Sequence, residues 1–162
     1  MWNDTDTPLA YFISFRSYGT WLHGDERGSI DHFHNGYGDP YVSPNKAWQR
    51  CNRKRLKSDP FILGARERRS VDEAIRETCR IRKWHLQALK VRTNHVHTVV
   101  TANREPGLVL NAFKANATRQ LRQDQLWSRS FSPWADKGST IRLWNERSVG
   151  NAIHYVMNGQ GD

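Results

Sequence analysis

Two histidines separated by one residue, His95 and His97, are the side chains in this sequence best placed to bind a metal ion. They lie in Asn94-His95-Val96-His97-Thr98-Val99-Val100-Thr101, whose β-branched residues predict a buried strand. Because side chains alternate along a strand, both imidazoles project to one face, roughly 6–7 Å apart at the backbone. Two neutral imidazoles on one rigid face can hold a divalent metal if a third ligand arrives from elsewhere. Taken alone, a strand with two incidental polar residues is the simpler interpretation.

Tyr155 is the candidate nucleophile, on a predicted last helix that begins at Ser148 and ends at Asn158-Gly159. A phenol, with an ordinary pKa of about 10, is a poor nucleophile unless the phosphate it attacks is activated. A divalent cation on His95 and His97 would polarise that phosphate and stabilise the charge that builds up on its oxygens. Attack by Tyr155 would form a covalent phosphotyrosine and free a 3′-hydroxyl. The alternative is a tyrosine that only packs its helix.

A long polar stretch separates the first predicted strand from the first predicted helix, and we interpret residues 25–64 as a basic loop insertion. It holds a second histidine pair, His32 and His34, among turn-forming residues that offer no rigid frame for a metal. It also holds a basic run beside Trp48, made of Arg50, Arg53, Lys54, Arg55 and Lys57. This run is either a solvated face or a set of phosphate contacts with a stacking aromatic nearby.

The elements that must position these residues follow in the order β-α-β-β-α-β, with a terminal helix. Strands are predicted at 9–16, 84–91, 94–101 and 139–144, and helices at 70–83, 108–123 and 148–158. Ser70 and Glu73 form a capping box at the start of the first helix. The order predicts an α+β, ferredoxin-like split βαβ fold, with helices packed on an antiparallel sheet of four or five strands.

Composition favours a single domain over residues 1–162 and a polyanionic partner, since 25 Lys and Arg face 16 Asp and Glu for a net charge of +9. The two cysteines, Cys51 and Cys79, give no metal spacing and no disulfide framework, and Cys79 falls on the predicted core side of its helix. No stretch is apolar enough to span a membrane, and the start is no signal peptide. We therefore expect a cytoplasmic protein without a membrane partner.

The histidine strand resembles the HUH motif of single-tyrosine transposases, of the insertion-sequence-200 and REP-associated types. Further pieces match in the same order along roughly residues 9–161: Phe12-Ile13-Ser14-Phe15-Arg16, Trp21, Gly24, Lys114, Gly138-Ser139-Thr140, Leu143-Trp144, Tyr155-Val156 and Gly159-Gln160-Gly161. The resemblance implies the HUH transposase fold and a single-stranded DNA endonuclease and strand transferase that uses Mg²⁺ or Mn²⁺. It implies that His95 and His97 bind the metal, that Tyr155 forms a 5′-phosphotyrosine, and that the DNA is single-stranded or a hairpin.

The third metal ligand is the point at which this chain departs from the family. The resemblance implies a Gln or Asn one turn after the tyrosine, but that position is Gly159, which has no ligating side chain. Gln160, or else Asn158, must take its place, and we expect Gln160. The departure leaves open a degenerate, domesticated protein that binds single-stranded nucleic acid without cutting it.

DNA contacts are expected from a set of basic and aromatic residues: Lys114, Arg53, Lys54, Arg55, Arg119 and Trp21. Lys114 either contacts the scissile phosphate or lies on a solvated helix face. Trp21, Trp127 and Trp134 either stack on unpaired bases or pack in the core. A homodimer is possible because two cuts are easier with two tyrosines, and the basic charge suggests association with the nucleoid.

Two other classes of protein fit the fold less well. An RNA-recognition module would need aromatic residues on the surface of the middle strands, where this chain has imidazoles. A two-histidine phosphoesterase would need two separated His-x-Ser/Thr pairs, and only one candidate is present.

Overall fold

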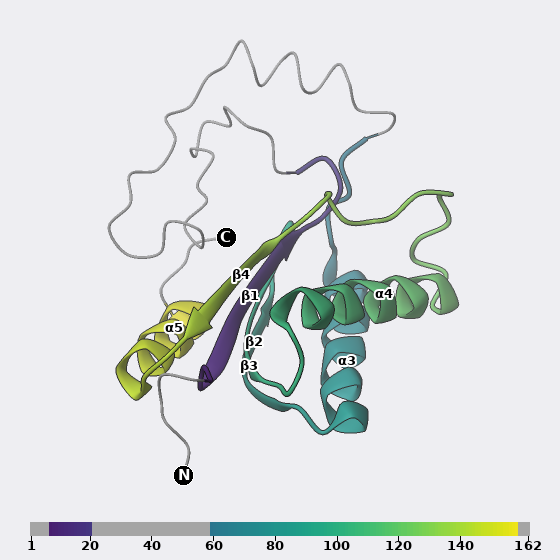
Figure 1. The fold of residues 1–162 in the computed structure, drawn as a ribbon. Coiled ribbons are helices and arrows are strands. Elements are labelled where there is room, and N and C mark those ends of the chain that lie inside the picture. Colours follow the sequence, from purple (N-terminus) through teal and green to yellow (C-terminus); the bar gives the residue numbers. More distant parts are fainter. Residues whose placement is uncertain (1–6, 21–58, 159–162) are drawn as a thin grey trace.

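The computed structural model describes residues 7–20 and 59–158 of the chain (Figure 1). Within them the elements are β1 (Ala10–Arg16), α3 (Ala65–Arg82), β2 (His85–Val91), β3 (His95–Thr101), α4 (Pro106–Gln123), β4 (Ser139–Leu143) and α5 (Glu146–Asn158). The predicted β-α-β-β-α-β order with a terminal helix is confirmed.

The four described strands form one sheet in the order β2-β3-β1-β4, and every neighbouring pair is antiparallel. β2 and β3 form the predicted hairpin, and β1 and β3 take the two central positions. This order is that of the ferredoxin-like split βαβ fold, so the predicted α+β class is confirmed. The histidine strand β3 is therefore held between strands on both sides.

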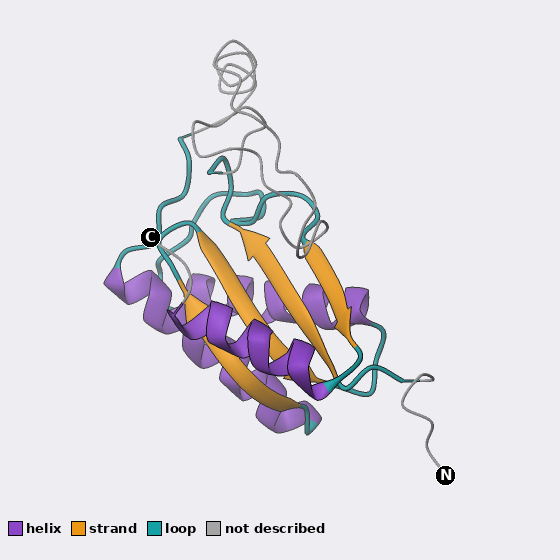
Figure 2. Cartoon of the chain, turned by 90° about the vertical axis from the view of Figure 1, so that its left-hand side faces the viewer, coloured by secondary structure: helices purple, strands orange, loops and turns teal. Residues whose placement is uncertain are grey.

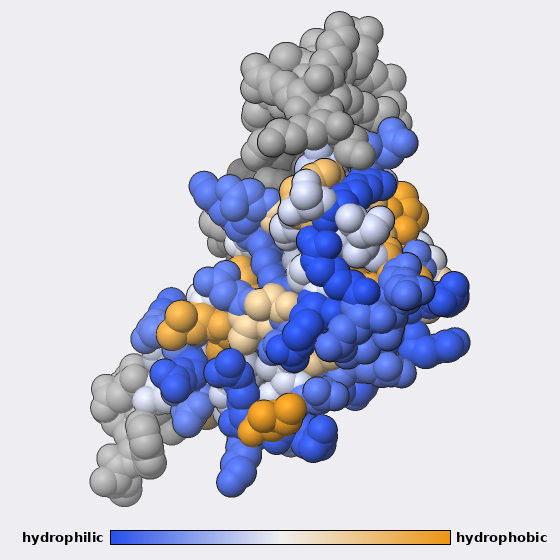
Figure 3. All heavy atoms as spheres, turned by 90° about the vertical axis from the view of Figure 1, so that its right-hand side faces the viewer, coloured by the Kyte–Doolittle hydropathy of each residue, from blue (hydrophilic) through white to orange (hydrophobic). Residues whose placement is uncertain are grey.

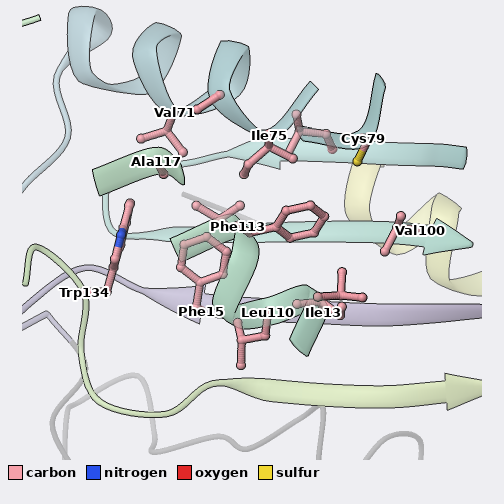
Figure 4. Packing of buried hydrophobic residues seen from close by; sticks show 14 of the residues in the cluster. Ile13, Phe15, Val71, Ile75, Cys79, Val100, Leu110, Phe113, Ala117 and Trp134 are labelled. Atoms are coloured by element: carbon pink, nitrogen blue, oxygen red, sulfur yellow. The ribbon is translucent and has the colours of Figure 1, made fainter. Parts of the chain in front are cut away.

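Helices cover both faces of the sheet: α3 and α4 lie on one face and α5 crosses the other (Figures 1 and 2). The alternation of side chains in β1 serves both layers, because Ile13 and Phe15 pack under α3 and α4 while Ala10 and Phe12 pack under α5. Figure 4 shows the larger cluster, in which Phe15 and Phe113 lie between the two helices and the sheet. The sheet thus separates two packing clusters.

The start of α3 differs from the prediction. The helix begins at Ala65, five residues before the predicted N-cap Ser70, and Gly64 occupies the cap position. Ser70 is buried, and its hydroxyl donates to Asp124 Oδ2 at 2.9 Å, just after α4. The Ser-x-x-Glu pattern is therefore not a cap here, because tertiary contact with Asp124 takes the Ser70 hydroxyl.

The start of α5 also differs. The helix begins at Glu146, and Asn145 Oδ1 accepts a hydrogen bond from the Ser148 backbone N–H at 2.8 Å. Asn145 is therefore the capping residue, and Ser148, the predicted N-cap, is its third helical residue.

The predicted place of Cys79 on the core side of its helix is confirmed. Cys79 is buried in the larger cluster, and so are Trp127 and Trp134, whose indole N–H groups donate to Phe131 O and to Lys114 O. These two tryptophans pack the core and do not lie open for base stacking. Among the described helices, none has the length and apolar character needed to cross a membrane.

Candidate active site

The two imidazoles of β3 lie together on the face of the sheet that α5 crosses. Their ring centroids are 4.6 Å apart, and the residues are only 7% (His95) and 3% (His97) exposed. Val96 and Val100 point to the opposite face, into the larger cluster. The alternation predicted from the sequence therefore places the pair on a rigid central strand.

Each imidazole has a short hydrogen bond at Nδ1. His95 Nδ1 lies 2.6 Å from Asn94 Oδ1, and His97 Nδ1 lies 2.5 Å from Ser14 Oγ on the neighbouring strand. An amide oxygen can only accept, so a neutral His95 ring can make this contact as a hydrogen bond only with its proton on Nδ1. Such contacts orient ligating histidines in metal sites.

Tyr155 lies on the side of α5 that faces the sheet. Its ring contacts Phe12, with centroids 5.8 Å apart, and His97, with centroids 5.9 Å apart and the rings inclined by 73°. Val156 is buried beside it, whereas His154 points outward and is exposed. The structure thus places Tyr155, the predicted nucleophile, against His97, one of the two predicted metal ligands. More than fifty residues separate the two in the sequence.

Polar side chains surround the imidazoles on the same face of the sheet. Directly paired residues of neighbouring strands share a face, which puts Lys90 and Ser14 on either side of His97 and Ser139 beyond Ser14. Arg16 pairs with His95 in the same way. Positive charge therefore borders the pair on both neighbouring strands.

Ser139 Oγ is buried, and among the described residues no hydrogen-bond partner reaches it. A buried hydroxyl without a partner costs stability, so such a group in a native fold requires an explanation. Ser139 lies two strands from His97, on the same face of the sheet.

His95 and His97 could supply two of the ligands that a divalent cation needs. Two buried imidazoles with oriented rings supply two nitrogen ligands, of the kind that Mn²⁺ and other divalent ions accept. The described part of the chain contains no cluster of three His, Cys, Asp or Glu side chains. Asn158 is exposed at the end of α5, with its amide nitrogen 3.5 Å from His154 Nδ1, and Gln160 lies outside the described residues.

Lys114 lies on α4, on the other side of the sheet from the imidazoles. Its ammonium group donates to the carbonyl oxygens of Ala135 and Lys137, and so holds the loop before β4 against the helix. Burial lowers the pKa of Lys114, and Asp136 partly opposes this. The contacts give Lys114 a structural role, and a phosphate contact stays a prediction.

Arg119 is exposed on α4, beside a groove of about 240 Å³ between α3 and α4 that Arg82 and Asn116 also line. Figure 3 shows that this side of the molecule is largely hydrophilic, with scattered hydrophobic patches. Arg119 is not part of the imidazole face. The other predicted DNA contacts, Trp21, Arg53, Lys54 and Arg55, lie outside the described residues, as do His32 and His34.

Sequence reasoning missed the residues that orient the imidazoles. Asn94 was visible as the polar residue directly before the strand, and Ser14 as the single polar residue inside an apolar one. Neither type implies a role by itself. Only the pairing of Ser14 with His97 across two central strands reveals the contact.

The sequence comparisons identify the family to which a chain with this fold belongs. The family described as "Transposase IS200 like" matches residues 55–157, more than half of the chain. The chain belongs to this IS200-like transposase family. A search of curated proteins found no match.

A solved structure shares the fold. A REP-associated tyrosine transposase bound to a REP hairpin matches with a TM-score of 0.53 and 10% identity, over 93% of this chain and 65% of that one. The chain thus spans a little less than two thirds of that protein. A protein from Deinococcus radiodurans R1 described as a candidate transposase matches with a TM-score of 0.47 and 12% identity, over 96% of this chain and 93% of that one.

Proposed function

We propose that the protein is a single-stranded DNA endonuclease and strand transferase that uses Mg²⁺ or Mn²⁺ and forms a 5′-phosphotyrosine on Tyr155. One observation carries the proposal: the Tyr155 ring lies against His97, which is itself paired with His95 on a rigid strand. A nucleophile and ligands for a metal ion are among the groups that transfer of a phosphodiester by a phenol uses. Membership of the transposase family agrees with this chemistry.

In the proposed reaction the phenolic oxygen of Tyr155 attacks the scissile phosphorus while the bond to the 3′-oxygen breaks. The phenol loses its proton to solvent, and the departing 3′-oxygen takes up a proton. The products are a 5′-phosphotyrosine and a free 3′-hydroxyl. Because the ester bond is exchanged and not hydrolysed, a second 3′-hydroxyl can attack the phosphotyrosine and complete strand transfer.

The chain's own residues prepare this step. His95 and His97 would hold the cation, which when bound supplies a Lewis acid for the phosphate oxygens. Phe12 and His97 pack against the Tyr155 ring and limit its rotation. In our proposal the third ligand is Gln160, or Asn158 in its place.

The proposed partner is single-stranded DNA, or DNA that folds into a hairpin. The net charge of +9 and the cations beside the imidazoles, Lys90 and Arg16, favour a polyanion at this face. The structural relative binds a REP hairpin, and we extend hairpin recognition to this chain as part of the proposal. We also propose that two copies act together when two cuts are required.

A catalytically degenerate DNA-binding protein is the second candidate. It is favoured by one observation, the lack of a third His, Cys, Asp or Glu ligand beside His95 and His97 within the described residues. Such a protein would bind single strands through the same basic face without forming a covalent product.

A covalent-adduct assay separates the two candidates. The intact protein is incubated with a panel of labelled DNA hairpins carrying single-stranded flanks, with Mn²⁺ or with a chelator. We expect a protein–DNA adduct only with the metal, and peptide mapping should place the nucleotide on Tyr155. Tyr155→Phe should abolish the adduct and still bind the DNA.

Tyr11→Phe is the matched control. Tyr11 lies on β1 in the larger cluster, where its hydroxyl donates to Arg104 O at 2.8 Å, so its loss should leave the adduct intact. An adduct formed by Tyr155→Phe would refute the role of Tyr155. DNA binding by the wild-type protein, with no adduct on any hairpin of the panel, would favour the degenerate candidate.

A further inference from the structure

We propose that Asn94 and Ser14 are positioning residues that set the tautomers of both active-site histidines. Their side-chain oxygens accept hydrogen bonds from the Nδ1–H groups of His95 and His97, and so present both Nε2 lone pairs to one divalent cation. The proposal rests on the metal-dependent reaction proposed above, and it assigns a task to two residues that do not touch the cation or the DNA.

The contact between Asn94 and His95 fixes the first tautomer. The two atoms, Asn94 Oδ1 and His95 Nδ1, are 2.6 Å apart and both residues are buried, at 7% exposure each. Since a buried amide oxygen accepts and never donates, the reverse tautomer would set the lone pair of Nδ1 against that of the oxygen. Such a repulsion inside the protein is costly because water cannot relieve it.

The main chain of Asn94 is held in place from outside β3. Its carbonyl oxygen accepts a hydrogen bond from the Ser17 N–H at 3.1 Å, and the Thr20 hydroxyl lies 3.2 Å from the same oxygen. The Ser17 hydroxyl, fully buried, donates to Phe61 O at 2.6 Å. These bonds fix the backbone of Asn94 beside β3, and its side chain is buried there against His95.

The contact between Ser14 and His97 uses a different strand. Ser14 is directly opposite His97 in the β1–β3 ladder, and the distance between Ser14 Oγ and His97 Nδ1 is 2.5 Å. A hydroxyl can donate or accept, so this bond does not by itself decide the tautomer. We assign His97 Nδ1 as the donor, because His97 Nε2 must carry a lone pair if it is to share a cation with His95.

The tautomers can be measured without any metal or DNA. Histidine ring nitrogens of the ¹⁵N-labelled wild-type protein are observed by NMR at neutral pH, and their signals are assigned with His95→Gln and His97→Gln. We expect the proton on Nδ1 and the lone pair on Nε2 in both rings. A proton on Nε2 of either neutral ring would overturn the proposal, whatever the activity of the enzyme.

Substitution at Asn94 then tests the consequence for metal binding. Asn94→Leu keeps the shape but removes the acceptor, and we expect a mixed tautomer in His95 and Mn²⁺ binding weakened by about 10- to 100-fold, as for other such partners of ligating histidines. Asn94→Asp restores an acceptor and should restore the wild-type tautomer. Ser14→Ala should weaken Mn²⁺ binding in the same direction through His97.

Asn103→Leu is the matched control, because it makes the same exchange at Asn103, which accepts from Trp84 Nε1 at 3.2 Å beyond the other end of β3. Its Mn²⁺ affinity, followed by the electron paramagnetic resonance of free Mn²⁺, should equal that of the wild type. Wild-type affinity in a folded Asn94→Leu protein would overturn the positioning role alone. Failure of the wild type to bind Mn²⁺ would overturn the metal-dependent function as well.

Discussion

Gly138 lies against the backbone of Ser14. A Cβ atom at Gly138 would come within 2.8 Å of the Ser14 carbonyl oxygen and within 2.9 Å of Leu110 Cδ2. The first of these neighbours is backbone of a central strand, which cannot give way cheaply. The residue before β4 therefore sets how closely β4 approaches the strand that carries the hydrogen-bond partner of His97.

The first prediction concerns this close approach. Gly138→Ala should lower the free energy of unfolding by about 1–3 kcal/mol, the usual cost of overpacking. Because Ser14 must shift, Mn²⁺ binding should also weaken. Urea unfolding and Mn²⁺ titration are the measurements.

Gly150→Ala is the control for that substitution. Gly150 is exposed in α5, and an added Cβ would meet nothing within 4 Å. Removing a glycine from a helix interior should stabilise the protein by about 0.5–1 kcal/mol. If both variants behaved alike, the steric argument for Gly138 would be wrong.

The second prediction concerns the cap of α5. Asn145→Ala should destabilise the protein by about 1 kcal/mol, because Asn145 Oδ1 accepts the backbone N–H of Ser148. Ser148→Ala keeps that N–H and should change stability by less than about 0.5 kcal/mol. Thermal unfolding of the pair decides between the observed cap and the one that the sequence favoured, and a larger loss at Ser148 would contradict the structure.

The third prediction concerns the pH dependence of stability at Cys79. Burial raises the pKa of this thiol from 9.0 to about 11, so the folded protein keeps its proton where the unfolded chain has lost it. The stabilising contribution is complete below pH 9.0, and it is lost as the pH rises toward about 11. Urea unfolding should show a loss of stability in this window that Cys79→Ala reduces.

Thiol labelling checks the same environment. In a Cys51→Ser background, native Cys79 should resist a disulfide reagent at neutral pH and react at once in denaturant, because the thiolate is the reactive form. Rapid labelling of the native protein would show that Cys79 is not buried as described.

The fourth prediction separates two roles of Lys114. If its task is to hold the loop before β4, Lys114→Met should cost about 1–3 kcal/mol in unfolding free energy, since two carbonyl oxygens lose a donor. The salt dependence of DNA binding should not change. A direct phosphate contact would instead lower the salt slope by about 1. Lys137→Met, which removes only an exposed side chain, is the control.

Most of the fold could be predicted because the patterns that define it are local. The apolar and β-branched runs of β1 and β3 and the helical spacing of Val71, Ile75 and Cys79 each follow from a few neighbouring residues. The helix starts could not be predicted in the same way. Ser70 and Ser148 both have side chains that can cap a helix. Ser70 instead donates to Asp124, and at the start of α5 it is Asn145 that accepts the free backbone N–H.

The candidate site was predictable where the chemistry is carried by residue type. His95, His97 and Tyr155 were singled out by residue type together with the resemblance of their motifs to a known family, and the structure adds that the tyrosine lies at the His97 ring. The places of three further residues beside the imidazoles could not be predicted: Ser14, Ser139 and Lys90. A serine or a lysine is placed near the site only by the pairing of its strand with the neighbouring strand. That register depends on long-range pairing, which sequence periodicity does not encode.

The sheet divides the protein into two independently packed compartments. Tyr155, the candidate nucleophile, packs against the smaller cluster, which α5, a helix of thirteen residues, covers. Most of the buried apolar residues lie on the opposite face of the sheet, under α3 and α4. Substitutions that disturb α5 should therefore affect Tyr155 and the smaller cluster first, while the larger cluster under α3 and α4 keeps its packing.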